Sequence, residues 1–220
     1  MNLKILSFCC LLLLWLTTAS IAFSFTPQNG DLYFQQLPSS EFTDAIASVT
    51  QGYCGLSLTH VGIFVYKDHK PYVIEAYDKV SLTSLNKFLE RSLNAEGKPK
   101  VIVGRLNAAY IKLIPKALKR AEKCIGLPYN FTFDIHNENA FYCSQLIYYA
   151  FISHKTGKSI FSLAPMTFKN PETGNLYPGW ISYFKKLKVA IPQGKLGINP
   201  GDISNSKALS IMYSYGGLKI

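Results

Sequence analysis

The chain has 220 residues, of which 48% are hydrophobic and 16% charged, and its formal net charge is +10 at pH 7. This length and apolar content suffice for one compact domain with a sizeable core, and they exclude a disordered or low-complexity chain. The basic balance allows peripheral contact with an anionic membrane or cell wall, although the positive runs at 116–123 and 185–188 are more typical of solvated faces of amphipathic helices. No nucleic-acid motif accompanies the charge, so no nucleic-acid partner is expected.

The first 22 residues have the pattern of a secretory signal peptide. Lys4 supplies a short basic region, residues 5–16 form an apolar run interrupted by Ser7, and Ser20 and Ala22 within residues 20–22 offer the small side chains that a signal peptidase recognises. The apolar run is too short to span a bilayer, although the uncharged stretch continues to Phe25 and leaves an uncleaved N-terminal anchor as the alternative. We therefore expect an exported protein, periplasmic or secreted, with a signal peptide over residues 1–22 and a single domain over residues 23–220.

Segments rich in β-branched and aromatic residues predict strands in the first half of the chain. They cover residues 30–36, 60–66, 71–77 and 100–106. The second and third flank the polar turn KDHK, which is the pattern of a β-hairpin. Two further segments suit helices, residues 41–53 as a short helix or ordered loop and residues 84–93 with Ser84 as the N-cap.

The second half of the chain predicts two helices and an irregular tail. Apolar residues at helical spacing run from residue 110 to 125, where Gly126 ends the helix, and Pro115 either opens or kinks it. Residues 143–154 predict a largely buried helix. The tail over 165–220 is too apolar and aromatic to be disordered, has one helical piece near 180–187, and is expected to wrap the core. Together these elements predict an α+β fold, with an antiparallel sheet and helices packed on one side of it.

The mature chain keeps three cysteines, Cys54, Cys124 and Cys143. Because three is odd, at least one of them is unpaired within the monomer in an oxidising compartment. A Cys54–Cys124 disulfide would leave Cys143 free, but the sequence does not decide the pairing. No CxxC pair or Cys/His cluster has the spacing of a zinc site, so we expect no metal and no other cofactor.

Cys143 lies where an aromatic loop gives way to the apolar helix in the segment FYCSQLIYYAF. At a helix N-terminus, unpaired backbone N–H groups and the helix dipole stabilise a negative charge, and the thiolate is the nucleophilic form of cysteine. A free cysteine is also among the most frequently buried residue types, and most buried cysteines are inert. The position alone leaves both interpretations open.

Four histidines are candidates for the base that a cysteine nucleophile needs. His60 opens a strand and so lies at the rim of the sheet. His69 falls in the charged hairpin turn and His136 in a polar loop. His154 lies eleven residues after Cys143, about 16 Å along a helix, which is out of reach. His60 is therefore the best-placed base.

Glu75 is the acidic residue of an otherwise apolar and aromatic strand, where an unpartnered carboxylate is costly. If the hairpin turn centres between Asp68 and His69, Glu75 pairs with Gly62. His60 would then be a diagonal neighbour of Glu75 on the same face, with room left by the missing side chain of Gly62. A register shifted by one residue would place the two on opposite faces. The alternative is a glutamate that faces water at a sheet edge.

Three segments together resemble the motifs of the NlpC/P60 superfamily: NGDLYF, THVGIFV and GLPYNFTFDIHNENAFYCSQLIYYAF. In ordinary members the cysteine motif comes first, whereas here it comes last. The chain therefore resembles the circularly permuted branch of the superfamily, with YiiX/YebB-like members, and the similarity covers essentially the whole mature chain. The resemblance implies a papain-like α+β fold with a Cys-His-polar triad.

The resemblance also implies roles for individual residues. Cys143 would be the nucleophile, His60 the general base and Glu75 the residue that orients the imidazole. Tyr129 would line the site and help to stabilise the oxyanion, together with the backbone N–H of Ser144. No departure from the family pattern occurs at the triad positions.

The implied activity is that of an exported cysteine hydrolase, an amidase or peptidase acting on a small peptide, a cell-wall peptide or an acyl-amide. Two alternatives remain open: a lipid-directed acyl hydrolase or acyltransferase similar to lecithin:retinol acyltransferase, and a non-catalytic binding module with the same fold. A disulfide-stabilised structural protein would require Cys143 to be bridged. The sequence leaves the oligomeric state and the choice between water and another acyl acceptor open.

Overall fold

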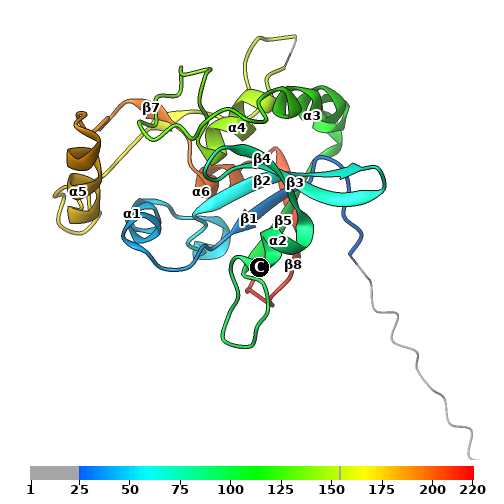
Figure 1. The fold of residues 1–220 in the computed structure, drawn as a ribbon, viewed down its shortest axis with the longest axis horizontal. Coiled ribbons are helices and arrows are strands. Elements are labelled where there is room, and N and C mark those ends of the chain that lie inside the picture. Colours follow the sequence, from blue (N-terminus) through cyan, green and yellow to red (C-terminus); the bar gives the residue numbers. More distant parts are fainter. Residues whose placement is uncertain (1–24, 154) are drawn as a thin grey trace, which may run out of the picture.

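The structure is a computed structural model that describes residues 25–153 and 155–220. The expected signal peptide and His154 lie outside these residues. An antiparallel sheet of six strands forms the centre, in the order β4-β3-β2-β1-β5-β8 (Figure 1). The strands are β1 (Leu32–Gln35), β2 (His60–Lys67), β3 (Lys70–Ala76), β4 (Val80–Ser84), β5 (Val101–Leu106) and β8 (Leu209–Ser214). A second, two-stranded sheet consists of β6 (Ala164–Pro165) and β7 (Leu196–Gly197).

Six α-helices surround the central sheet in the described part of the chain. They are α1 (Glu41–Val49), α2 (Leu85–Glu90), α3 (Ile114–Lys123), α4 (Cys143–Ala150), α5 (Pro178–Leu187) and α6 (Pro200–Ser204). Helices α3 and α4 lie side by side on the sheet, and α1 and α5 lie together beyond one of its ends (Figure 1). Within residues 25–153 and 155–220, no helix combines the length and the apolar character needed to cross a membrane.

The α+β class is confirmed, but the helices are not confined to one side of the sheet. Because side chains alternate along a strand, Leu32 and Phe34 join the main core beneath α4, whereas Tyr33 points into a smaller cluster on the opposite side. Phe88 of α2 belongs to this second cluster and contacts the ring of Tyr33 edge-on at 6.2 Å. Helix α2 therefore covers the far face of the sheet, which is the face opposite α4.

The hairpin has the predicted register. Asp68 and His69 both adopt positive φ, 49° and 59°, as a two-residue turn that follows the strand twist requires. This turn pairs Gly62 with Glu75. A Cβ on Gly62 would collide with the side chain of Val73 and lie 3.2 Å from the Cβ of Glu75, so only glycine fits between the two strands here.

Three predicted helix boundaries can be compared with the structure. A 3₁₀ helix over Ala108–Leu113 precedes α3, and Pro115 lies in the first turn of α3, so the proline opens the helix rather than kinking it. Ser84 is the N-cap of α2, but its side chain makes no capping hydrogen bond. Helix α4 ends at Ala150, four residues before the expected end at residue 154.

The tail beyond residue 164 packs against the rest of the molecule. Trp180 and Phe184 of α5 and Ile203 of α6 are buried in the main core. Strand β8, which the sequence analysis missed, extends the sheet next to β5. The three cysteines of the described chain are all free, so the possible Cys54–Cys124 disulfide is absent, and Cys143 is unbridged.

Candidate active site

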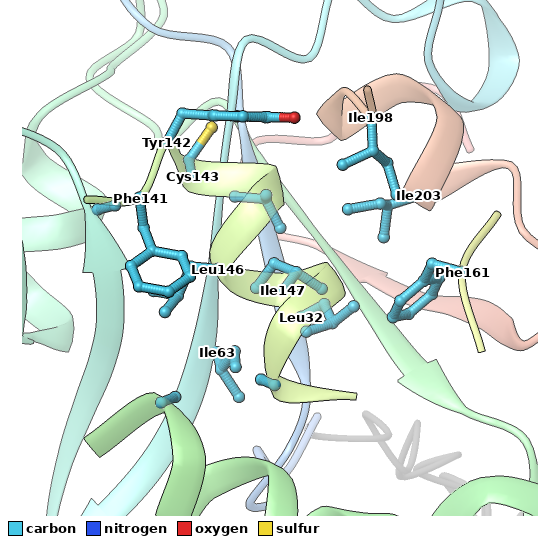
Figure 2. Close-up of a cluster of buried hydrophobic side chains, with 14 of the residues drawn as sticks. Leu32, Ile63, Phe141, Tyr142, Cys143, Leu146, Ile147, Phe161, Ile198 and Ile203 are labelled. Atoms are coloured by element: carbon cyan, nitrogen blue, oxygen red, sulfur yellow. The ribbon is translucent and has the colours of Figure 1, made fainter. Parts of the chain in front are cut away.

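Cys143 is the first residue of α4, and its side chain is only 5% exposed. Figure 2 shows its sulfur at the start of the helix, above the core side chains Leu146 and Ile147. The preceding loop is fastened to this helix by Gln145. Its side chain accepts a hydrogen bond from the Tyr142 N–H at 3.2 Å and donates to the carbonyl of Asn137 at 2.7 Å. Gln145 thus holds the backbone that carries Cys143, a role that the sequence analysis did not assign.

The residue after Cys143 has a structural side chain. The hydroxyl of Ser144 donates a hydrogen bond of 2.8 Å to the carbonyl of Ile198 and so joins α4 to the tail. The hydroxyl of Ser144 is therefore engaged in a structural hydrogen bond. The backbone N–H of Ser144, to which the resemblance assigned the oxyanion role, remains the group to consider.

His60 and Glu75 meet as the hairpin register requires. The imidazole Nε2 lies 2.6 Å from the Glu75 Oε2, and the two side chains are 3% and 0% exposed. Glu75 is therefore not a water-facing glutamate at a sheet edge. Because Nε2 is occupied by the carboxylate, Nδ1 is the ring nitrogen left to face Cys143, whose side chain helps to raise the pKa of His60.

Arg91 completes this cluster, and the sequence analysis missed it. Its two terminal nitrogens each donate a hydrogen bond of 2.7 Å to Glu75, one to each carboxylate oxygen. The guanidinium also lies over the ring of Tyr77, 4.1 Å from its centroid. Tyr77 in turn contacts the imidazole of His60 edge-on at 5.7 Å, and Phe88 packs against the same imidazole at 5.9 Å. Arg91 comes directly after α2, so the packing of α2 on this face of the sheet places the guanidinium beside Glu75.

The neighbours of His60 and Glu75 move their pKa values in opposite directions. Burial alone would raise the pKa of Glu75, but hydrogen bonds from Arg91 and His60 hold it at about 2. Burial alone would lower the pKa of His60, but hydrogen bonds to Cys143 and Glu75 raise it to about 9. At neutral pH the carboxylate is therefore ionised and the imidazole is protonated.

Tyr129 lies next to Cys143, where the sequence analysis expected it to line the site. It is buried next to Cys143, whose backbone partly offsets the rise in its pKa, and it lines the pocket into which Cys143 opens. Burial, followed by the proximity of Cys143, raises the pKa of Tyr129 well above its ordinary value, so the hydroxyl stays neutral. A neutral phenol can donate a hydrogen bond to a developing oxyanion.

The remaining described histidines take no part in this cluster. His69 is exposed in the hairpin turn and His136 is exposed in the loop before α4. Of the site residues expected from the sequence, the structure brings Cys143, His60, Glu75, Tyr129 and Ser144 together at one end of the sheet.

Comparison with known proteins identifies the family of the chain. Residues 26–213 match the family described as "Permuted papain-like amidase enzyme, YaeF/YiiX, C92 family". The chain belongs to this family. The permuted papain-like relationship and the α+β fold expected from the sequence are thereby confirmed.

Two relatives illustrate the family. The chain is 32% identical over 140 residues to the uncharacterized protein YiiX of Escherichia coli K12, covering 63% of this chain and 64% of that protein. The match therefore spans less than two thirds of that protein's length. The crystal structure of the metalloprotein YiiX from Escherichia coli O157:H7 superimposes with a TM-score of 0.69 at 22% identity, covering 86% of this chain and 98% of that one. At this identity, the second similarity supports the fold alone.

The description of that relative as a metalloprotein raises the question of a metal site in this chain. Across residues 25–153 and 155–220, no group of three or more His, Cys, Asp or Glu side chains is arranged to hold a metal ion. The described side chains therefore do not fit such a centre.

Proposed function

We propose that this protein hydrolyses amide bonds through a Cys143-His60-Glu75 triad and an acyl-enzyme on Cys143. The observation that carries the proposal is the position of His60, whose Nε2 lies 2.6 Å from Glu75 and whose pKa is raised by the neighbouring side chain of Cys143. This is the geometry of a nucleophile, a base and a residue that orients the base.

The first half of the reaction follows from the charges. His60 is held as imidazolium at neutral pH beside Cys143, which begins α4, and the thiolate of Cys143 is the proposed nucleophile. The sulfur attacks the amide carbon, and the carbonyl oxygen becomes an oxyanion. The Tyr129 hydroxyl and N–H groups of the first turn of α4, including that of Ser144, are the donors that would stabilise it.

Collapse of this intermediate breaks the C–N bond. His60 gives its Nδ1 proton to the leaving amine, and the acyl group stays on Cys143 as a thioester. The neutral imidazole then takes a proton from water, which attacks the thioester, releases the acid and regenerates the thiolate–imidazolium pair. Glu75 stays ionised throughout and keeps the ring orientation fixed.

We place the substrate outside the cytoplasm, because the first 22 residues have the pattern of a signal peptide. Small peptides and acyl-amides of the cell envelope are then the candidate substrates, and the positive net charge of +10 favours work near anionic envelope surfaces.

The first test is the reactivity of Cys143 towards iodoacetamide at about pH 6, where an ordinary thiol is protonated and slow. Cys54 is exposed and free, so it serves as the comparator within the same chain. Mass spectrometry of the two peptides should show faster alkylation of Cys143 despite its burial. Alkylation no faster than at Cys54 would support the non-catalytic binding module instead.

The second test is turnover. Cell-wall peptides and N-acyl amino acids are incubated side by side with the wild type and with Cys143→Ala and Cys54→Ala. We expect release of free amine by the wild type and by Cys54→Ala, and none by Cys143→Ala. Equal turnover by Cys143→Ala would remove this residue as the nucleophile.

A second candidate, an acyl hydrolase or acyltransferase that acts on lipids, is favoured by one observation. The pocket next to Cys143 is lined mainly by aliphatic and aromatic side chains. Both candidates share the acyl-enzyme and differ in the acyl group and in the acceptor. Phospholipid vesicles added to the turnover assay distinguish them, because loss of an acyl chain from lipid would be specific to the second.

A further inference from the structure

Gln35, the last residue of β1, is a polar side chain that is fully buried, with 0% exposure. Its Nε2 donates a hydrogen bond of 2.6 Å to the backbone carbonyl of Phe88 in α2. Within residues 25–153 and 155–220, its Oε1 has no hydrogen-bond partner. A buried acceptor without a partner is destabilising, and the great majority of buried polar atoms in folded proteins have one. The presence of this amide in the core therefore calls for a physical reason.

The strand register places Gln35 beside the imidazole of the site. Gln35 of β1 pairs directly with His60 of β2. Residues that face each other in an antiparallel pair project to the same face of the sheet, with Cβ atoms about 4.5–5.5 Å apart. That face is the one covered by α2, because Tyr33, two residues before Gln35, lies in the same cluster as Phe88. His60 is therefore flanked by Gln35 on one neighbouring strand and by Glu75 on the other.

The hydrogen bond from Gln35 also fixes the helix that covers the imidazole. It ends on the residue whose ring packs against His60, with 5.9 Å between the two ring centroids. At the other end of the same segment, the hydroxyl of Ser92 donates a hydrogen bond to the carbonyl of Gln36, the residue after Gln35. The end of α2 is thus tied to the end of β1 on both sides of Arg91, the residue that holds Glu75.

The unpaired oxygen of Gln35 has an electrostatic effect of its own. Only the NH₂ end of an amide can donate to a carbonyl, so the bond to Phe88 decides which end of the amide is Nε2 and which is Oε1. Oε1 carries the negative end of the amide dipole. In a buried site, a partial negative charge of this kind favours a positive neighbour over a neutral one, and His60 is the residue directly opposite.

We propose that Gln35 is a positioning residue of the Cys143-His60-Glu75 triad. It acts through its neighbours in two ways. Its Nε2 holds α2 against β1, so that Arg91 stays on Glu75, and its Oε1 favours the imidazolium form of His60. This inference rests on the proposed function and adds to it a residue that does not touch the substrate.

The test is Gln35→Met, which removes both polar atoms of the amide and keeps a side chain of similar length. The readout is the pH profile of Cys143 alkylation by iodoacetamide, measured by mass spectrometry of the Cys143 peptide. We expect alkylation at about pH 6 to slow by about fivefold or more, the factor that corresponds to one lost hydrogen bond. The acid limb of the profile should move to higher pH, because a less stable imidazolium is a weaker partner for the proposed thiolate. A profile identical to that of the wild type would overturn the positioning role.

Ser204→Ala is the matched control for a purely structural effect. Ser204 is 2% exposed, and its hydroxyl donates a hydrogen bond of 2.7 Å to the carbonyl of Gly201 and accepts one of 2.9 Å from the N–H of Tyr53. This variant should lower the Tm and leave the pH profile of Cys143 alkylation unchanged. If Gln35→Met and Ser204→Ala both lowered the Tm and neither moved the profile, Gln35 would be a structural residue alone and the proposal would fail.

A measurement on the wild type tests the same contact without any substitution in the core. In isotope-labelled protein, the NMR signal of the Gln35 side-chain amide should shift as His60 titrates near its pKa of about 9, because the two side chains face each other across the strands. A Gln35 amide signal that stays constant while His60 titrates would overturn the proposal, even if Gln35→Met failed to fold.

Failure of the proposed function itself would look different. If iodoacetamide alkylated Cys143 of the wild type no faster than Cys54 at about pH 6, the triad would be excluded, and Gln35 would have no nucleophile to support. Fast alkylation of wild-type Cys143 together with an unchanged profile in Gln35→Met would remove the role of Gln35 alone.

Discussion

Arg91→Met removes the guanidinium that holds Glu75 and keeps a side chain of similar length. In the wild type, the side chain of Glu75 is 0% exposed. Its carboxylate receives two hydrogen bonds of 2.7 Å from Arg91 and has one contact with the imidazole of His60. After the substitution, the carboxylate is buried with His60 as its remaining partner. The free energy of unfolding and the pKa of Glu75 should therefore both change.

Two approaches give the same magnitude. Removing one partner of a buried ion pair costs about 3–5 kcal/mol, and the 19% exposure of Arg91 favours the lower end. The pKa of Glu75 is lowered from 4.5 to about 2, a net effect of about 3 kcal/mol after the opposing cost of burial, with the hydrogen bonds from Arg91 as the largest favourable cause. A loss of about 3 kcal/mol lowers the Tm of a chain of this size by roughly 6–12 °C.

The pH dependence has a definite sign. A carboxyl whose folded pKa is lowered contributes stability above its unfolded pKa of 4.5, and this stability is lost as the pH falls through about 2. Without Arg91, the folded pKa of Glu75 rises. The acid limb of Cys143 alkylation by iodoacetamide should therefore move to higher pH, because Glu75 is protonated earlier and no longer holds the imidazolium.

Arg105 offers a matched control away from the site. It donates two hydrogen bonds of 2.8 Å to the carboxylate of Asp31, which is 1% exposed, and Arg105 itself is 23% exposed. Arg105→Met should lower the Tm by a similar amount and leave the pH profile of Cys143 alkylation unchanged. If Arg91→Met and Arg105→Met shift the Tm alike and neither moves the profile, Arg91 is an ordinary structural ion pair and the reasoning is refuted.

Three further predictions concern the other members of the site. The raised pKa of His60 stabilises the fold below about pH 6.5, and this contribution is lost as the pH rises through about 9. The free energy of unfolding in urea should therefore decline across this pH range in the wild type and not in His60→Gln. Tyr129→Phe should lower turnover by about 100-fold with a change in unfolding free energy of only about 1 kcal/mol; equal turnover would exclude an oxyanion role. Gly62→Ala should destabilise the protein by about 1–3 kcal/mol and slow alkylation of Cys143, because the added Cβ collides with Val73 and crowds Glu75; wild-type alkylation with a lowered Tm would show that the two effects are separable.

The hairpin shows what the sequence could predict. A two-residue turn at Asp68 and His69 fixes the register, the register fixes the face of each side chain, and the meeting of His60 with Glu75 follows from local geometry alone. Glu75 also carried a signal of its own, because a carboxylate in an apolar strand needs a partner.

Arg91 shows what local patterns could not provide. In the sequence it is one of several charged residues in a short amphipathic segment, and its meaning depends on α2 covering the far face of the sheet. The far-face position of α2 is a matter of tertiary packing that periodicity does not specify. Gln145 did carry a recoverable signal, because a glutamine at the third position of a helix is typical of a residue that bonds back to the N-cap backbone.

The missed strands have a similar cause. Strand β4 runs directly into α2, and the sequence analysis assigned only its last residue, Ser84, as the N-cap of the helix, whereas β8 lies in a tail rich in turn residues. Both are the outer strands of the sheet. An edge strand is defined by the neighbour that it pairs with more than by its own composition, and that neighbour is distant or ambiguous in the sequence.

Arg91 also accounts for how a buried triad can pass through its cycle at low cost. In the proposed resting state, Arg91 and the His60 imidazolium are positive while Glu75 and the Cys143 thiolate are negative, so the cluster is neutral. In the acyl-enzyme, the thioester and the imidazole are both neutral, and Arg91 still balances Glu75. Without Arg91, both states would carry one uncompensated negative charge in a buried site, where such a charge is costly. In the proposed cycle, the guanidinium therefore does more than orient a carboxylate, because it would keep the net charge of the buried cluster at zero on both sides of the acylation step.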